Sequence, residues 1–565
     1  MNINSFHRFA IILLVITLSS CSLMPKGGKQ KSLTFDQKRR FDQAYFEASK
    51  LKVLGDFTGS AKLFADALKI DPNNHAAMYQ LANLNMAVKS YHEAIYWSER
   101  SIEHNKTYNF WYYGQLAQAY SKVSDFKKSA ETFKVMMSKD GDRKSNYIEA
   151  GNQYINAREF KLAISIFNSY QKKFGIDEES ARKKEGMYYE MGKPKEAISA
   201  MEELVSAYPN ELRYQGLLAE SYVRAQQFQD AINTYQNILD QDDKNGFAHF
   251  GLADVYRRTN KPDESFNHLS LAFDDPNVSS DLKIKVMGTY YPYIRTTEKM
   301  RIQALELGEK LIEVHPMEAE AYVAYGDILY AASQAPEARL NLLKATTIDA
   351  SNMNVWRKIL SLDDEVGNFQ HLFEDSKSVL ELFPNHTFLY IVNSFAAYAI
   401  KDFKSAQKVA KDGLEISVVV KDQIDLLSTL ADASHELGDN EESDKAFEEL
   451  LELDPENDGA LNNYAYYLSL REVKLEKALT MIKKALQIRP DQITYTDTYG
   501  WILYQMGLYE EALPLLKEAY ERMSDAAEVV EHYANVLIKT GKKTEGEKLL
   551  LEAEKIRTEN QMLKG

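Results

Sequence analysis

The chain has 565 residues, of which 45% are hydrophobic and 27% charged, and its formal net charge is −15 at pH 7. A surplus of carboxylates repels phosphate, which argues against a nucleic-acid partner. The single cysteine excludes an intramolecular disulfide framework.

The N-terminus is organised like a secretory signal peptide. A short basic start, residues 1–8, precedes an apolar run at 9–18 that is too short to remain as a membrane-spanning helix. The sequence Leu18-Ser19-Ser20-Cys21 follows and resembles the bacterial lipobox, in which the cysteine is lipidated and becomes the first residue of the mature protein. We therefore predict a signal peptide over 1–20 and lipidation of Cys21. The alternative is an ordinary cleaved signal with an incidental cysteine.

Lipidation would fix the location of the protein. Several acyl chains, at about 0.8 kcal/mol per buried methylene, make a firm membrane anchor. Ser22 is not the aspartate that in many Gram-negative lipoproteins signals retention at the inner membrane, so we expect the outer membrane. Surface-exported lipoproteins of Bacteroidota often carry acidic residues after the cysteine, whereas this chain has Lys26, Lys29 and Lys31. We therefore expect the periplasmic face.

Residues 21–40 are predicted to form a tether. The segment contains Pro25, Gly27 and Gly28 and too few apolar side chains to form a hydrophobic core. Its lysines and arginines either contact anionic lipid headgroups or are simply solvated. Removal of residues 1–20 takes away one basic residue, Arg8, so the 68 basic and 83 acidic residues of the chain become a net charge of −16.

The rest of the chain repeats with a nearly constant period. A small residue recurs every 34 or 35 positions, and only the steps into Ala304 and Ser443 are longer. It marks the start of the second helix in each of about fifteen helical hairpins, from Phe41 to about residue 560. The marker positions are Ser60, Ala94, Ser129, Ala163, Ala197, Ala231, Ser265, Ala304, Ala338, Leu372, Ala406, Ser443, Ala478, Ala512 and Gly546. Leu372 is large, so its repeat is expected to pack less regularly.

Two irregular stretches divide the predicted stack into blocks. Pro276 and Pro292 interrupt helices near residues 275–300, where a change of path or a hinge is expected. A second long step lies near 417–422. We therefore predict an N-terminal block at 41–284, a middle block at 285–423 and a C-terminal block at 424–560.

The clearest repeats lie near the C-terminus. Ala478 and Ala512 are 34 residues apart, and the pair Ile482/Ala485 recurs as Leu516/Ala519. This period and residue set resemble the tetratricopeptide repeat (TPR). The resemblance implies an all-α TPR solenoid, a right-handed superhelix of about fifteen helix-turn-helix repeats.

The sequence lacks the motifs of common catalytic sites. None of the 11 histidines has the two-histidine spacing of a zinc protease, and there is neither a phosphate-binding loop nor a Gly-x-Ser-x-Gly elbow. We therefore predict that the protein is not an enzyme and has no cofactor or metal site, and that it acts by binding other proteins.

The first helices of a TPR stack line its concave groove, where exposed positions recur at i, i+4 and i+7. On this pattern the candidate groove residues are Asn462, Tyr466, Asp497, Trp501, Tyr504, Glu531 and Asn535. This groove is acidic and aromatic, which is unlike the Lys/Arg and Asn clamp by which co-chaperone TPRs grip a terminal carboxylate. Trp501 is the expected anchor, although it could instead pack between neighbouring helices.

A second candidate spot is basic and lies in earlier repeats. Arg224, Arg257 and Arg258 fall on adjacent repeats and would suit an acidic partner or an anionic glycan. The alternative is that they pair with neighbouring carboxylates, Asp254 or Glu220.

Three C-terminal segments go beyond the general repeat pattern. They are residues 462–468, 497–501 and 531–533, and together with the lipobox they resemble a TPR lipoprotein family of Gram-negative bacteria, most like those of Bacteroidota. The resemblance implies an adaptor anchored to the outer membrane whose partners are proteins of the cell envelope. It would assemble a complex for secretion, gliding, outer-membrane biogenesis or lipid export. The alternative is a regulatory subunit that presents or activates a periplasmic enzyme such as a peptidoglycan hydrolase.

Overall fold

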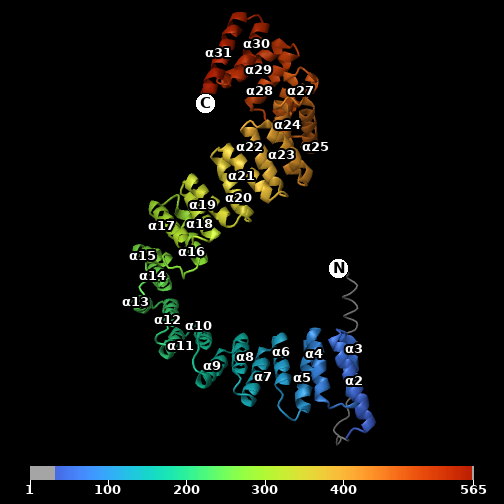
Figure 1. Cartoon of the computed structure of the whole chain (residues 1–565), viewed down its shortest axis with the longest axis vertical. Helices are drawn as coiled ribbons and strands as arrows, with labels where there is room; N and C mark the ends of the chain where they lie inside the picture. Colours follow the sequence, from blue (N-terminus) through green and yellow to red (C-terminus); the bar gives the residue numbers. More distant parts are fainter. Residues whose placement is uncertain (1–31, 563–565) are drawn as a thin grey trace. The chain divides into compact units, whose positions relative to one another are not determined.

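The computed structural model describes residues 32–562 of the chain (Figure 1). This part contains thirty α-helices and one short 3-10 helix, and no β-strand. The predicted all-α class is confirmed. The predicted signal peptide, Cys21 and the first part of the tether lie outside the described residues.

The chain divides into two compact units, one ending at Ala272 and the other beginning at Phe273. Each unit is a series of helical hairpins, with an even-numbered first helix and an odd-numbered second helix. In unit 1 the pairs are α2 (Phe35–Val53) with α3 (Phe57–Ile70), α4 (His75–Ala87) with α5 (Tyr91–His104), α6 (Phe110–Lys122) with α7 (Phe126–Lys139), α8 (Lys144–Asn156) with α9 (Phe160–Phe174), α10 (Glu178–Glu190) with α11 (Pro194–Ala207), α12 (Leu212–Arg224) with α13 (Phe228–Leu239), and α14 (Gly246–Arg258) with α15 (Pro262–Phe273).

Unit 2 continues the same alternation. Its pairs are α16 (Ser280–Met287) with α17 (Glu298–Val314), α18 (Ala319–Ala331) with α19 (Ala335–Ile348), α20 (Met353–Glu365) with α21 (Phe369–Leu382), α22 (Thr387–Ala399) with α23 (Phe403–Ile416), α24 (Val420–Glu436) with α25 (Asn440–Leu453), α26 (Asp458–Leu470) with α27 (Leu475–Ile488), α28 (Ile493–Gln505) with α29 (Tyr509–Arg522), and α30 (Ala527–Lys539) with α31 (Lys543–Met562). The division into three blocks stays a prediction.

The recurring small residue marks the second helix of every pair. It is the fourth residue in fourteen of the fifteen second helices, and Ala304 alone lies further along because α17 begins earlier. Nearly all the marker residues are fully buried, since a small side chain lets the two helices of a pair approach closely. Leu372 is also buried, in a cluster with Leu360 and Leu389, so this larger side chain is accommodated in the core.

The turn inside fourteen of the fifteen pairs, all except α16 with α17, uses the left-handed backbone conformation. Six of these turns contain a glycine at positive φ, for example Gly55 and Gly192. Eight others hold a non-glycine residue there, for example Lys89 and Arg158. Such residues adopt this conformation less readily than glycine, so the packing of the flanking helices must hold the turn.

The structure corrects the predicted start of the repeats. Helix α2 begins at Phe35, so residues 35–40 are helical and do not belong to the tether. Thr34 and Gln37 explain this start, because each side chain accepts a hydrogen bond from the backbone N–H of the other. Asp36 in the first turn also forms ion pairs with Arg39 and Arg40.

The repeat at the beginning of unit 2 is irregular. Its first helix, α16, has only 8 residues and is followed by the 3-10 helix η1 (Tyr291–Tyr293), which contains Pro292. Proline lacks the N–H that would continue an α-helix. The irregularity lies where the sequence predicts it, and the hinge stays a prediction.

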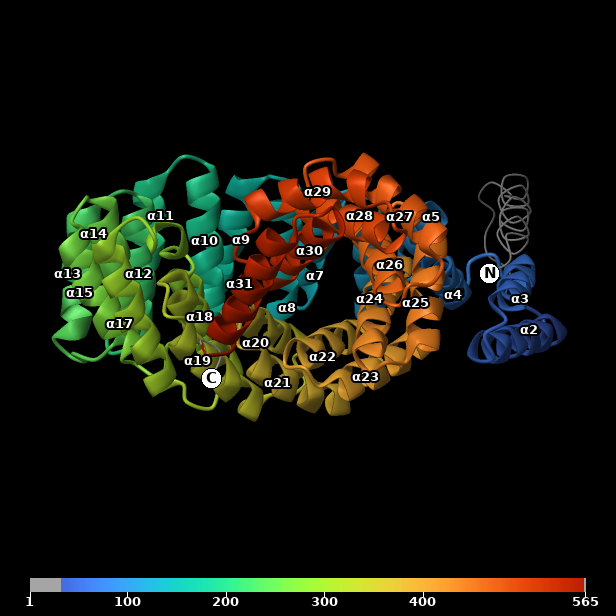
Figure 2. The same ribbon diagram turned by 90° about the horizontal axis from the view of Figure 1, so that it is seen from above.

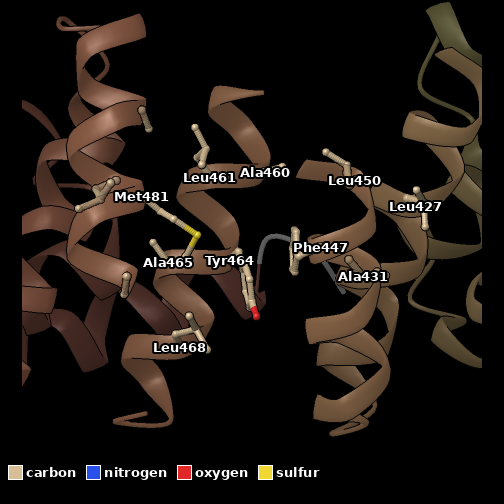
Figure 3. Close-up of a cluster of buried hydrophobic side chains, with 14 of the residues drawn as sticks. Leu427, Ala431, Phe447, Leu450, Ala460, Leu461, Tyr464, Ala465, Leu468 and Met481 are labelled. Carbon is tan, nitrogen blue, oxygen red and sulfur yellow. The ribbon is translucent and has the colours of Figure 1, made fainter. Parts of the chain in front are cut away.

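Unit 2 has its largest hydrophobic cluster around α24–α28 (Figure 3). At its centre the rings of Phe447 and Tyr464 are stacked, with centroids 5.1 Å apart. Tyr464 is completely buried, and its hydroxyl donates to Glu448 over 3.0 Å. Figure 3 shows Ala465 and Met481 on the other side of α26, so one first helix contacts side chains from both of its neighbours.

Consecutive first helices of unit 2 contact one another directly, for instance α22 with α24, α26 with α28 and α28 with α30. Figure 2 shows α22, α24 and α26 on the inner side of this part of unit 2 and α23 and α25 on its outer side. Side chains that project from the first helices away from their pairs therefore share one inner face.

Candidate protein-binding face

The predicted groove residues of unit 2 fall on three consecutive first helices. Six of them occupy the fifth and ninth positions of α26, α28 and α30, and Tyr504 lies three residues after Trp501 on α28. We define the C-terminal face as Asn462, Tyr466, Asp497, Trp501, Tyr504, Glu531, His532 and Asn535. His532 joins the predicted set because the structure places its ring in contact with the others.

The contact at the centre of the C-terminal face joins α28 to α30. Nδ1 of His532 lies 2.8 Å from Oδ2 of Asp497, and an ionised carboxylate only accepts, so the imidazole N–H donates. The two side chains are only 6% and 9% exposed. The second carboxylate oxygen, Oδ1 of Asp497, is buried and has no hydrogen-bond partner within residues 32–562. A buried acceptor without a donor is costly, so a donor supplied from outside this part of the chain would be favourable.

Trp501 is half-buried in the same region. Its ring stacks on His532, with centroids 4.1 Å apart, and on Tyr504, with centroids 4.8 Å apart. The indole Nε1–H is buried and has no acceptor in the part of the chain that the structure describes. Trp501 therefore packs against the neighbouring helix and also carries an unused donor.

Helix α26 contributes one aromatic and one amide side chain. The ring of Tyr466 lies 6.1 Å from that of His532 in an edge-to-face arrangement. Burial raises the pKa of the Tyr466 hydroxyl, and the carboxylates of Glu528, Asp497 and Glu531 raise it further. The Nδ2 atom of Asn462 donates to Asn463 over 3.2 Å, while its buried Oδ1 finds no donor among the described residues.

The edge of the C-terminal face is more exposed to solvent than its centre. Glu531 accepts a hydrogen bond of 2.6 Å from Arg557 on α31, and Asn535 is half-buried. The ring of Tyr504 also contacts Tyr509, at 5.3 Å between centroids. The centre of the face therefore contains buried polar atoms without hydrogen-bond partners among the described residues, whereas Glu531 at the edge is paired with the Arg557 side chain.

A second polar cluster on the inner face was missed by the sequence analysis. On α24, Asp432 accepts hydrogen bonds from the Tyr467 hydroxyl at 3.1 Å and from Nδ2 of Asn463 at 3.4 Å. The rings of His435 and Tyr467 are stacked with centroids 3.5 Å apart. The i, i+4, i+7 pattern, extended back to α24, would have selected Asp432 and His435.

The predicted basic spot in unit 1 is already engaged by neighbouring side chains. The Arg224 guanidinium lies over the ring of Tyr189, 4.0 Å from its centroid. Arg257 and Arg258 both pair with Asp254, and the distance from Arg258 Nε is 2.6 Å. The structure thus places these cations in local interactions, Asp254 being one of the two carboxylates named as the alternative.

Within residues 32–562, no group of three or more His, Cys, Asp or Glu side chains is placed to hold a metal ion. Over the same range, no helix has the length and apolar character needed to span a membrane.

Comparison with known proteins identifies the repeat. Four models described as tetratricopeptide repeat match residues 186–211, 217–272, 424–457 and 503–563. The chain is 23% identical over 314 residues to the TPR repeat-containing protein YpiA of Bacillus subtilis (strain 168), which covers 54% of this chain and 71% of that protein.

Two solved structures are also similar. A structure of Naa15/Naa10 bound to HypK-THB is 13% identical, covers 92% of this chain and 95% of that chain, and has a TM-score of 0.34. The APC/C hetero-tetramer Cut9-Hcn1 is 12% identical, covers 82% and 96%, and has a TM-score of 0.32.

Proposed function

Because the chain is a tetratricopeptide-repeat protein, we propose that it is a non-catalytic scaffold, held at the periplasmic side of the outer membrane by lipid on Cys21, that binds a protein of the cell envelope. The C-terminal face is the binding surface. Such a scaffold would assemble an envelope complex for secretion, gliding or outer-membrane biogenesis.

The observation that carries this proposal is the unpaired polar chemistry at the centre of the C-terminal face. Asn462, Asp497 and Trp501 each bury a side-chain atom with no hydrogen-bond partner among the described residues. Buried polar atoms are nearly always paired in folded proteins, and unpaired ones call for an explanation. A partner that supplies the missing donors and acceptor explains all three, and aromatic residues beside them provide the contact area typical of interface anchors.

The anchor rests on sequence evidence. The lipobox-like run ending at Cys21 follows an apolar stretch of signal-peptide length, and Ser22 favours the outer membrane. Substitution Cys21→Ser tests it: metabolic labelling with palmitate should be lost, and the protein should move from the membrane fraction to the soluble fraction. Unchanged labelling would contradict lipidation of Cys21.

Partner recovery tests the scaffold role. Tagged full-length protein, pulled down from detergent-solubilised envelopes, should bring a partner in fixed stoichiometry, identified by mass spectrometry. The double substitution Trp501→Ala, Tyr466→Ala should abolish that recovery with helicity intact. The matched control is Phe57→Ala, Tyr96→Ala, which removes two exposed aromatic side chains from second helices.

Two results would oppose the proposal. Recovery of the tagged protein without any partner would argue against a scaffold. Full recovery of the partner by the double variant would exclude the C-terminal face as the binding surface. Altered cell-wall hydrolysis on deletion, with secretion intact, would instead favour the regulatory subunit of a peptidoglycan enzyme.

A further inference from the structure

The proposed partner surface has a chemistry that selects its ligand. We infer that the C-terminal face binds an extended segment of the partner through an arginine or lysine side chain that reaches Asp497. This inference rests on the proposed function and specifies what the face recognises.

The carboxylate of Asp497 is the main determinant. Its side chain is 9% exposed, Oδ2 is taken by His532, and Oδ1 lacks a partner within residues 32–562. A carboxylate oxygen can only accept hydrogen bonds, so the missing group must be a donor, and a cationic donor gives the strongest bond.

A second acceptor lies on the neighbouring first helix. Asn462 is the fifth residue of α26 and Asp497 the fifth residue of α28, and these two helices contact each other. The buried Oδ1 of Asn462 also has no donor in the described part of the chain. Two free acceptors on adjacent helices suit the several N–H groups of a guanidinium or an ammonium group.

The surrounding charge has the sign that a cation requires. Glu528, Glu531 and Asp497 all act on the Tyr466 hydroxyl, which places three carboxylates around this part of the face. Arg557 on α31 is paired with Glu531 at the edge of the face. An anionic ligand would meet these carboxylates, whereas an arginine or lysine would offset them.

The aromatic side chains complete the site. The rings of Tyr466 and Tyr504 offer apolar surface for the aliphatic stem of a long side chain and faces or edges for its charged end, while the Trp501 ring is stacked on both His532 and Tyr504. The unused Nε1–H of Trp501 is a donor, and it suits a main-chain carbonyl of the same segment. The site therefore combines selection of a cation with a main-chain contact.

Peptide binding tests this inference with full-length protein in detergent. The probes are fluorescein-labelled nine-residue peptides of alanine and serine with one central guest residue, Arg, Lys, Gln or Glu, and the readout is fluorescence anisotropy. The Arg and Lys peptides should bind about tenfold or more tightly than the Gln peptide, as expected for a charge-assisted hydrogen bond, and the Glu peptide most weakly.

Three variants separate the contributions. Asp497→Asn keeps the shape of the side chain and should abolish the preference for Arg over Gln. Glu510→Gln removes one exposed charge from second helix α29 and should keep the preference. Trp501→Phe removes the indole donor and should weaken every peptide by a similar factor, which keeps the inference testable if the Asp497 variant fails to fold.

Equal binding of the Arg and Gln peptides to the unaltered protein would overturn the inference, as would an unchanged preference in Asp497→Asn. Its failure is distinguishable from failure of the scaffold role. If the Trp501→Ala, Tyr466→Ala variant loses the envelope partner while no peptide preference exists, the scaffold stands and the cation site does not.

Discussion

The ammonium group of Lys283 lies 3.0 Å from Nε2 of His315, and both side chains are buried. The same ammonium donates to the backbone carbonyls of Phe273 at 2.8 Å and Asp275 at 2.9 Å. Burial lowers the Lys283 pKa to about 8, against the opposing influence of nearby carboxylates. This one side chain joins the first residues of unit 2 to α16 and to the end of α17.

Lys283→Met should therefore loosen the irregular first repeat of unit 2. The two carbonyls and His315 would lose their common donor, at a cost of about 3 kcal/mol. Hydrogen–deuterium exchange should show reduced protection in α16 and α17. Lys285→Met on the exposed side of α16 is the control, and equal protection in both variants would contradict the role assigned to Lys283.

Gly500 should not tolerate a methyl group. A Cβ atom there would lie 2.7 Å from Cδ2 of Leu516, which is fully buried on α29. Overpacking of this kind costs about 1–3 kcal/mol, so Gly500→Ala should lower the urea midpoint of unit 2. Gly459→Ala, whose new atom would meet nothing closer than 3.6 Å, should show no such loss.

The serines at the marker position should differ from one another. Ser129 Oγ donates to the Ala117 carbonyl over 2.8 Å, whereas the buried Oγ of Ser443 has no partner among the described residues. Ser129→Ala should thus cost about 1 kcal/mol, while Ser443→Ala should be neutral or stabilising. Chemical denaturation of the two variants measures the difference, and the reverse order would contradict it.

Asp432 should make the stability of unit 2 depend on pH between about 4 and 6. Burial raises its pKa to about 6, although the hydrogen bonds from Tyr467 and Asn463 oppose the rise. Because the folded state then holds a proton that the unfolded state releases near pH 4, stability falls as the pH rises from about 4 to 6.

Asp432→Asn keeps an acceptor for both hydrogen bonds and removes the buried charge. It should stabilise the protein at pH 7 by about 2 kcal/mol and flatten the dependence of the free energy of unfolding on pH between 4 and 6. Denaturation at several pH values tests this. An unaltered slope would mean that Asp432 is not the responsible group.

The regular parts of the fold were predictable because they depend on local spacing. The marker residues from Ser60 to Gly546 locate every second helix of the described residues, since a close helix pair favours a small side chain there, and Leu372 is the one large exception. The sequence signals the left-handed turns only where they contain glycine, as at Gly55 and Gly192. Lys89 and Arg158 adopt the same backbone conformation without any local signal, because the packed helices on either side impose it.

The face was predicted only in part. The i, i+4, i+7 pattern selected Asp497, Trp501 and Tyr466, which the structure brings together. The pattern did not select His532, which follows Glu531 directly on α30. The His532 ring contacts Asp497, Tyr466 and Trp501 and so links these three side chains. The pattern also selected Arg224, Arg257 and Arg258, which the structure places against Tyr189 and Asp254.

By itself the sequence determined the helical class and the period of the repeats, because both follow from the order of large, small and polar residues along the chain. The resemblance to TPR proteins implied which helices face inward. Only the tertiary structure decided which polar atoms of that face are left unpaired. Pairing depends on contacts between α24, α26, α28 and α30, whose residues lie some 30 positions or more apart, and no local pattern records which donor reaches which acceptor.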